Sequence, residues 1–143
     1  MTATSAPRIL LADDHDAFRE GVRRLLEREG FAVVGAVSNG REALRLAREL
    51  QPDVAVLDLS MPVLDGFETA RAIAGACPET KLVALTGHSD PPYVSRALRV
   101  GFAGYVLKPR AAEELVHAIR VVHQGLTHLP QGFWTRRQGS VSR

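Results

Sequence analysis

The sequence predicts an open, doubly wound α/β fold, in which helices cover both faces of one five-stranded parallel sheet. Short apolar runs alternate five times with longer segments of helical period. Most of these runs are continuously apolar, which is typical of parallel strands buried on both faces. A length of 143 residues with 45% hydrophobic residues suits one domain with a single core.

Five apolar runs supply the strands, and each is followed by a segment with helical spacing of apolar side chains. The predicted strands are residues 8–12, 32–37, 53–57, 81–85 and 104–107.

The first two helices follow from apolar side chains spaced three and four residues apart. This spacing predicts a helix over 16–29, which Gly30 ends as a C-terminal glycine commonly does. It predicts a second helix over 40–50, which stops before Pro52.

The third helix is predicted over 66–77 and is closed by Pro78. The fourth begins at Asp90, a favoured N-cap residue, with Pro91 and Pro92 in its first turn. Its predicted inner face holds Tyr93, Ala97 and Val100.

The last helix has an apolar stripe, and Glu113 and Glu114 complement the positive end of its dipole. The stripe consists of Leu115, Val116, Ile119 and Val122. The preceding residues 110–112 offer no short polar side chain as an N-cap, so we expect the start of this helix to fray.

Composition excludes several classes of protein. The longest uncharged apolar runs, such as 31–37, are far shorter than the roughly 20 residues of a membrane-spanning helix. The first eight residues lack the apolar stretch of a secretory signal, and the lone Cys77 excludes disulfide and cysteine-rich zinc frameworks. We therefore expect a cytoplasmic protein with no membrane partner.

The net charge of +2 does not predict a nucleic-acid-binding surface. Three of the 18 basic side chains, Arg136, Arg137 and Arg143, lie in the last 14 residues, where there is no acid. The first 129 residues therefore hold 15 basic and all 16 acidic side chains. A phosphate-binding footprint needs clustered basic residues on a folded face.

Polar residues occur at the carboxyl ends of four predicted strands, where ligands bind in sheets of this type. Asp13 and Asp14 follow the first strand, Asp58 the third, Thr86 ends the fourth and Lys108 follows the fifth. The first and third strands are neighbours in this topology, so the three carboxylates should converge. Two carboxylates about 4 Å apart repel by roughly 4 kcal/mol at an effective dielectric of 20. The cluster therefore predicts a Mg²⁺ site, since Mg²⁺ prefers oxygen ligands.

Each of these residues has a simpler explanation when taken alone. Asp13 and Asp14 could cap the following helix, and Asp58 could be a turn residue. Thr86 could satisfy the loop backbone, and Lys108 could be a solvated cation. Their joint placement at the ends of different strands favours a functional site.

These residues resemble the receiver domains of bacterial response regulators. The motif consists of Asp13-Asp14, Asp58, Met61-Pro62, Asp65-Gly66, Thr86 and Lys108-Pro109. The resemblance covers roughly residues 7–126 and implies the flavodoxin-like receiver fold, (βα)5, with strand order 2-1-3-4-5. The segments 85–87, 93–98 and 101–108 are similar to the subfamily whose receivers precede a LuxR-type helix-turn-helix.

The resemblance implies a role for each residue around the acidic cluster. Asp58 is the expected phosphoacceptor and takes its phosphoryl group from the phosphohistidine of a sensor histidine kinase. Asp14, Asp58 and the backbone carbonyl of Ser60 are the expected Mg²⁺ ligands, with Asp13 acting through a water. Lys108 is expected to neutralise charge on the transferring oxygens.

The resemblance also implies a conformational switch. Thr86 is expected to donate its hydroxyl to the phosphoryl group, and Tyr105 occupies the position of the aromatic switch residue. Ser60 and His88 are expected to flank the path of the hydrolytic water. Histidine as a residue type can change its charge between about pH 5 and 8, so any effect of His88 on hydrolysis is expected to depend on pH. Lys108-Pro109 replaces the Lys-Asp of many close relatives.

The domain organisation follows from the same comparison of motifs. We expect a disordered start at 1–6, a receiver domain at 7–126 and a linker or tail at 127–143, rich in Gly, Gln, Ser and Arg. A helix-turn-helix of some 60 further residues is absent, so the chain is either a stand-alone receiver acting through protein contacts or a fragment. It is not expected to be an enzyme beyond its own phosphorylation and dephosphorylation. It could dimerise on phosphorylation, with DNA bound only through an output domain.

Two other classes fit less well. A Mg²⁺-dependent aspartate-nucleophile phosphatase of the haloacid dehalogenase type needs a second Asp two positions after the first, where this chain has Ser60. A nucleotide or flavin-binding module needs a glycine-rich loop after the first strand, where this chain has acids.

Overall fold

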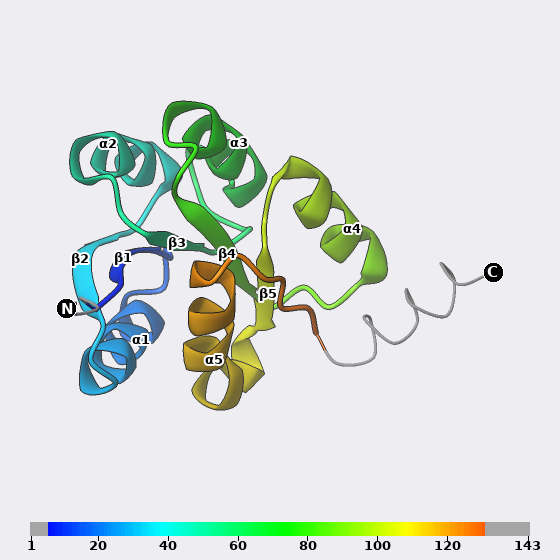
Figure 1. Cartoon of the computed structure of the whole chain (residues 1–143). Coiled ribbons are helices and arrows are strands. Elements are labelled where there is room, and N and C mark those ends of the chain that lie inside the picture. The colour runs from blue at the N-terminus through cyan, green and yellow to red at the C-terminus, as the bar shows by residue number, and fades with distance from the viewer. Residues whose placement is uncertain (1–5, 131–143) are drawn as a thin grey trace.

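Residues 6–130 are described by a computed structural model (Figure 1). Five parallel strands form one sheet in the order β2-β1-β3-β4-β5, which confirms the predicted fold class and strand order. The strands are β1 (Arg8–Ala12), β2 (Ala32–Val37), β3 (Val54–Leu57), β4 (Lys81–Thr86) and β5 (Gly104–Leu107). The helices are α1 (Asp16–Arg28), α2 (Gly40–Leu50), α3 (Gly66–Ala76), α4 (Pro91–Val100), the 3₁₀ turn η1 (Lys108–Arg110) and α5 (Ala111–His123).

Helices cover both faces of the sheet, which gives three layers (Figure 1). Buried side chains of α1 and α5 pack on one face, and those of α2, α3 and α4 pack on the other. All four residues of β3 are fully buried, as the prediction of strands covered on both faces requires. That prediction is wrong for β2, whose residues are half-buried or exposed, because β2 is an edge strand with one neighbour.

The helix ends explain where the sequence patterns start and stop. Gly30 has φ +92° just beyond α1, a left-handed conformation that glycine adopts without strain. Asp65 and Glu68 form a capping box at the start of α3, which fixes the chain directly after the β3 loop. On α4, Val94 is buried beside the predicted Ala97, whereas Tyr93 is only partly buried and turns toward α3.

The start of α5 differs from the expectation. No side chain caps it, as predicted, but the chain enters α5 directly from the 3₁₀ turn η1. The tighter turn supplies a backbone hydrogen bond from Ala111 to the Lys108 carbonyl, which takes the place of a cap. The bond before Pro109 is trans.

Residues beyond α5 return to the sheet. The His128 backbone N–H donates to the Ala103 carbonyl at 3.0 Å, and the Tyr105 N–H donates to the His128 carbonyl at 2.9 Å. Leu129 packs against the core on the face that α2, α3 and α4 cover, and Pro130 is buried. The described chain is therefore paired with the edge of β5 at His128, just beyond residue 127, where the tail was expected to begin. The rest of that tail and residues 1–5 lie outside the described part, so those expectations remain untested.

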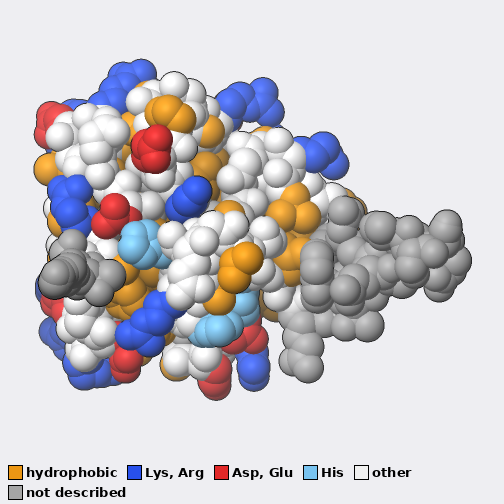
Figure 2. Space-filling model, viewed as in Figure 1, with side chains coloured by type: hydrophobic (Ala, Val, Ile, Leu, Met, Phe, Trp, Pro, Cys, Tyr) orange, Lys and Arg blue, Asp and Glu red, His pale blue; other side chains and the backbone are white. Residues whose placement is uncertain are grey.

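The charged side chains on the face drawn in Figure 2 are of both signs and interspersed. That distribution agrees with the nearly balanced charge of the first 129 residues. Among residues 6–130 no helix combines the length and apolar character that a bilayer crossing requires.

Candidate functional site

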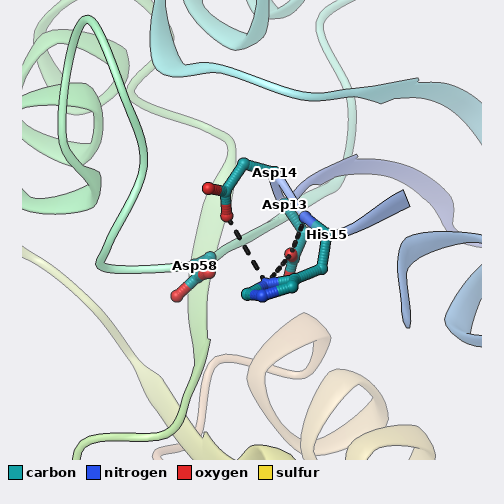
Figure 3. Close-up of side chains that lie close together, drawn as sticks. All are labelled: Asp13, Asp14, His15 and Asp58. Atoms are coloured by element: carbon teal, nitrogen blue, oxygen red, sulfur yellow. Dashed lines mark hydrogen bonds and ion pairs between the residues drawn. The ribbon is translucent and has the colours of Figure 1, made fainter. Parts of the chain in front are cut away.

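The topology places the acidic residues at one edge of the sheet. β1 and β3 are paired in parallel with Ala12 opposite Leu57, so Asp13 and Asp58 leave the sheet side by side. The Asp58 N–H donates to the Ala12 carbonyl at 3.0 Å, which continues the ladder by one residue. Figure 3 shows Asp58 close to the side chains of the loop after β1. The predicted convergence of Asp13, Asp14 and Asp58 is thus present in the structure.

Two of these carboxylates are buried and share one cation. Asp13 is 1% exposed and Asp58 is 3% exposed. The Lys108 ammonium lies 2.9 Å from Oδ2 of Asp13 and 3.1 Å from Oδ2 of Asp58. The ammonium is thus within hydrogen-bonding distance of both carboxylates. One cation is shared between two buried acids.

The electrostatics show that one lysine does not balance two acids. Burial raises the pKa of Asp58, and the nearby Asp13 charge raises it further against the opposing effects of the Ser60 amide and Lys108. Burial alone would lower the pKa of Lys108, but its contacts with Asp13 and Asp58 outweigh burial and raise it. An isolated ion pair would lower the pKa of its acid. Burial is the main cause of the raised pKa of Asp58, and the contact with Lys108 does not offset it.

The side chains suit a magnesium ion. Asp13, Asp14, His15 and Asp58 each offer one ligand atom, and these atoms all lie within 4.8 Å of one another. Three of the four donors are carboxylates, which Mg²⁺ prefers over imidazole. Asp13 and Asp58 are both buried and share the one ammonium of Lys108, so a hard cation or its hydration shell would compensate the remaining charge. The residues therefore fit Mg²⁺.

His15 is a member of the cluster that the sequence analysis did not single out. Its Nδ1 lies 3.6 Å from Oδ1 of Asp13 and 3.7 Å from Oδ1 of Asp14 (Figure 3). Its backbone N–H donates to Asp13 Oδ1 at 2.8 Å, which turns the loop. The only signal in the sequence is its place next to the acid pair, since spacing does not reveal which way a loop side chain points.

The pKa of Asp58 predicts a pH-dependent effect on stability. Folding raises the pKa of the Asp58 carboxyl above its ordinary value of 3.8. Such a group stabilises the fold when it is protonated, below pH 3.8, and this stabilisation is lost as the pH rises through the pKa of the folded protein. Ionised Asp58 therefore destabilises the metal-free protein at neutral pH. We expect Asp58→Asn to raise its Tm at about pH 7, with a gain that shrinks toward about pH 3.5.

Thermal denaturation by circular dichroism in the presence of a chelator measures this difference. Each kcal/mol gained raises Tm by roughly 2–4 °C in a chain of this size. An equal gain at both pH values would show that Asp58 ionisation is not its source.

Thr86 and Tyr105 connect the pocket to the last part of the sheet. Thr86 ends β4, is fully buried and accepts a hydrogen bond from the His88 N–H at 3.4 Å. Tyr105 lies on β5 with its ring buried, and its hydroxyl donates to the His88 carbonyl at 2.6 Å. Burial raises the pKa of Tyr105, and Tyr93 and Asp90 raise it further, so this hydroxyl stays protonated as a donor.

Ser60 and His88, predicted to flank the path of the hydrolytic water, contact each other. Ser60 Oγ lies 2.8 Å from His88 Nε2, and the Ser60 N–H donates to Asp58 Oδ1 at 3.2 Å. The His88 ring stacks on Tyr93 and does not extend freely into solvent. The loops after β3 and β4 are therefore joined next to the acidic cluster.

The glycine of the Asp65-Gly66 motif is explained by close packing. A Cβ at Gly66 would lie 2.3 Å from the Asp58 carbonyl oxygen and 2.5 Å from the Cα of Leu59. Both atoms belong to the backbone and cannot rotate away. Only glycine allows α3 to begin directly against the loop that carries Asp58.

The sequence and the fold match known proteins with the same arrangement. The model of the response regulator receiver domain matches residues 9–120. The chain is 41% identical over 123 residues to the response regulator GacA of Pseudomonas viridiflava, covering 85% of this chain and 58% of that protein. It is 39% identical over 122 residues to the response regulator UvrY of Escherichia coli, covering 85% of this chain and 56% of that protein. The chain thus spans less than two thirds of the length of these relatives.

Solved structures agree with the sequence comparisons. The fold is similar to a LuxR-family two-component response regulator from Aurantimonas, with a TM-score of 0.89, 35% identity and coverage of 97% of this chain and 100% of that chain. It is also similar to the isolated receiver domain of RcsB from Salmonella enterica in the presence of phosphomimetic BeF3⁻, with a TM-score of 0.82, 28% identity and coverage of 91% and 97%. The family match, the strand order and the acidic pocket lead to one conclusion: the chain belongs to the response regulator receiver domain family, and its relatives are regulators of the GacA and LuxR type.

Proposed function

We propose that Asp58 accepts a phosphoryl group from the phosphohistidine of a sensor histidine kinase. A carboxylate oxygen of Asp58 forms the new bond to phosphorus as the bond from phosphorus to the imidazole nitrogen breaks. The observation that carries this proposal is the excess negative charge of the pocket. Asp13 and Asp58 are both buried and share only Lys108, so the pocket is suited to bind a cation and, with it, an anionic phosphoryl group.

The surrounding residues would position the reacting groups. Asp14, Asp58 and the Ser60 carbonyl would hold Mg²⁺, with Asp13 in the outer shell. When bound, Mg²⁺ supplies positive charge that offsets the charge on the phosphoryl oxygens. Lys108 would move from its shared contact with the carboxylates to bridge Asp58 and the phosphoryl group.

Labelling by a small phosphodonor tests this proposal. Incubation with acetyl phosphate and Mg²⁺ is expected to add one phosphoryl group, detected by intact-protein mass spectrometry. A chelator in excess over Mg²⁺ should suppress the addition. A chain that gains no phosphoryl group, or gains it equally without Mg²⁺, would contradict the proposed function.

We also propose that phosphorylation is transmitted through Thr86 and Tyr105. Thr86 would donate its hydroxyl to the new phosphoryl oxygen, which draws the loop after β4 toward Asp58. That loop carries His88, whose carbonyl accepts the Tyr105 hydroxyl hydrogen bond, so movement of the loop changes the contact of Tyr105. The surface of α4, β5 and α5 would change as a result.

Hydrogen exchange measures this transmission. Beryllofluoride with Mg²⁺ is expected to alter amide exchange within residues 86–110, and Thr86→Ala should reduce the change while leaving phosphorylation in place. Identical exchange with and without beryllofluoride would exclude this path.

We infer that the complete protein controls transcription through a helix-turn-helix output domain. The support is the similarity to GacA and to a "Putative transcriptional regulator", of which this chain covers 58% and 60%, and the similarity to the LuxR-family structure. The receiver would act in the cytoplasm, dimerise on phosphorylation and catalyse only its own phosphorylation and dephosphorylation. Light scattering with and without beryllofluoride tests the dimer, and an unchanged monomer would argue against it.

A further inference from the structure

The imidazole of His88, in the loop after β4, contacts two other side chains, Ser60 and Tyr93. Its Nε2 lies 2.8 Å from Ser60 Oγ, at hydrogen-bonding distance. Its ring is stacked on Tyr93 with the centroids 4.2 Å apart and the planes 6° from parallel. A hydrogen bond fixes the tip of the ring, and stacking fixes its plane.

The His88 ring lies next to a residue that contacts Asp58. Ser60, whose hydroxyl the ring contacts, donates its backbone N–H to Asp58 Oδ1, and Asp58 is the expected phosphoacceptor. The His88 N–H donates to Thr86 Oγ1. The ring therefore joins the loops after β3 and β4 at the side of the pocket.

Tyr93 is itself fixed by the helices. It lies in the first turn of α4, and its ring is stacked on Phe67 of α3 at 6.0 Å with an angle of 27° between the planes. Phe67 is buried, and the Arg96 guanidinium lies 4.0 Å over its ring. The Tyr93 hydroxyl makes no hydrogen bond within residues 6–130. Tyr93 therefore contacts His88 through the face of its ring and not through its hydroxyl.

We propose that Tyr93 is a positioning residue that sets the lifetime of the phosphoryl group by holding the His88 ring against Ser60. Held there, the imidazole limits access of water to a phosphoryl group on Asp58. Without Tyr93 the ring turns about its side-chain torsions, the contact with Ser60 is lost and water enters. This inference rests on the proposed phosphorylation of Asp58 and adds to it a residue that lies outside the acidic pocket.

Decay of the phosphorylated protein tests the proposal by a double-mutant cycle. We expect His88→Ala to speed loss of the phosphoryl group about fivefold. This is the rate change expected when an interaction as strong as one hydrogen bond no longer holds the ring in the way of water. Tyr93→Ala should give a similar increase. The double variant should decay no faster than His88→Ala, because Tyr93 acts through His88. Tyr93→Phe keeps the stacked ring and should decay like the parent protein.

Three results would overturn the proposal: parental decay of Tyr93→Ala, additive effects in the double variant, or fast decay of Tyr93→Phe. A second measurement separates this inference from the proposed function. The His88 ring protons should be shifted upfield by the ring current of Tyr93 in NMR spectra of the unphosphorylated protein, and Tyr93→Ala should abolish the shift while Tyr93→Phe retains it. If Asp58 takes up no phosphoryl group, the proposed function fails and the lifetime role with it. If the ring shift is missing, only the positioning role fails.

Discussion

Replacing Asp58 with alanine is expected to abolish labelling of the chain by acetyl phosphate. Asp58 lies directly after β3, is buried and is hydrogen-bonded to Lys108, so its removal should leave the pocket without its proposed nucleophile. Asp13 is also buried, but it lies in the loop after β1, where its Oδ1 accepts a hydrogen bond from the His15 N–H. Intact-protein mass spectrometry measures the loss.

The matched control is Asp16→Ala. Asp16 is an exposed acid in the first turn of α1 and is not one of the clustered ligand residues, so labelling should be unchanged. The Asp58→Ala protein should remain folded by circular dichroism, because the change removes a buried charge that has too little compensation. Labelling of Asp58→Ala at the parental level would refute the assignment.

Replacing Asp14 with alanine is expected to weaken Mg²⁺ binding by about tenfold or more, a loss of at least about 1.4 kcal/mol of binding free energy. Mg²⁺ takes only one or two carboxylates directly, so the loss of one removes a large part of the protein's contribution. The Asp14 side chain is 37% exposed, so its removal leaves no buried cavity that would disturb the fold.

Isothermal titration calorimetry with MgCl₂ measures this affinity, and Asp16→Ala again serves as the control. Asp14→Ala should also need more Mg²⁺ to reach half-maximal labelling by acetyl phosphate. An unchanged Kd together with an unchanged Mg²⁺ requirement would remove Asp14 from the metal site.

The features that depend on chain order could be predicted from the sequence. Strict alternation of apolar runs and helical segments predicts a parallel sheet, because each helix carries the chain back to the end of the sheet at which the previous strand began. The carboxyl ends of the strands then lie on one side of the sheet, and the strand order implied by the resemblance brings Asp13, Asp14, Asp58 and Lys108 together. The resemblance indicates Gly66 as a motif residue, whereas its close approach to the Asp58 backbone is a property of the folded chain.

The features that depend on side-chain direction and on sheet edges could not be predicted. A continuous apolar run looks the same in a central strand as in β2, because burial is decided by the number of neighbouring strands. The pairing of His128 with the edge of β5 joins residues far apart in sequence and has no local pattern. The place of His15 in the acidic cluster and the stacking of His88 on Tyr93 depend on loop conformations. The resemblance placed Ser60 and His88 beside the pocket, but the side chains that they contact are known only from the folded structure.

The most direct test of the phosphoacceptor assignment is to locate the phosphoryl group in the native chain. The protein is phosphorylated with acetyl phosphate and Mg²⁺, treated with borohydride to convert an aspartyl phosphate into homoserine, and digested with trypsin. The peptide of residues 49–71, which contains Asp53, Asp58 and Asp65, is then sequenced by tandem mass spectrometry. Conversion at Asp58 alone is the predicted result, and conversion at another aspartate or an intact Asp58 in labelled protein would contradict it.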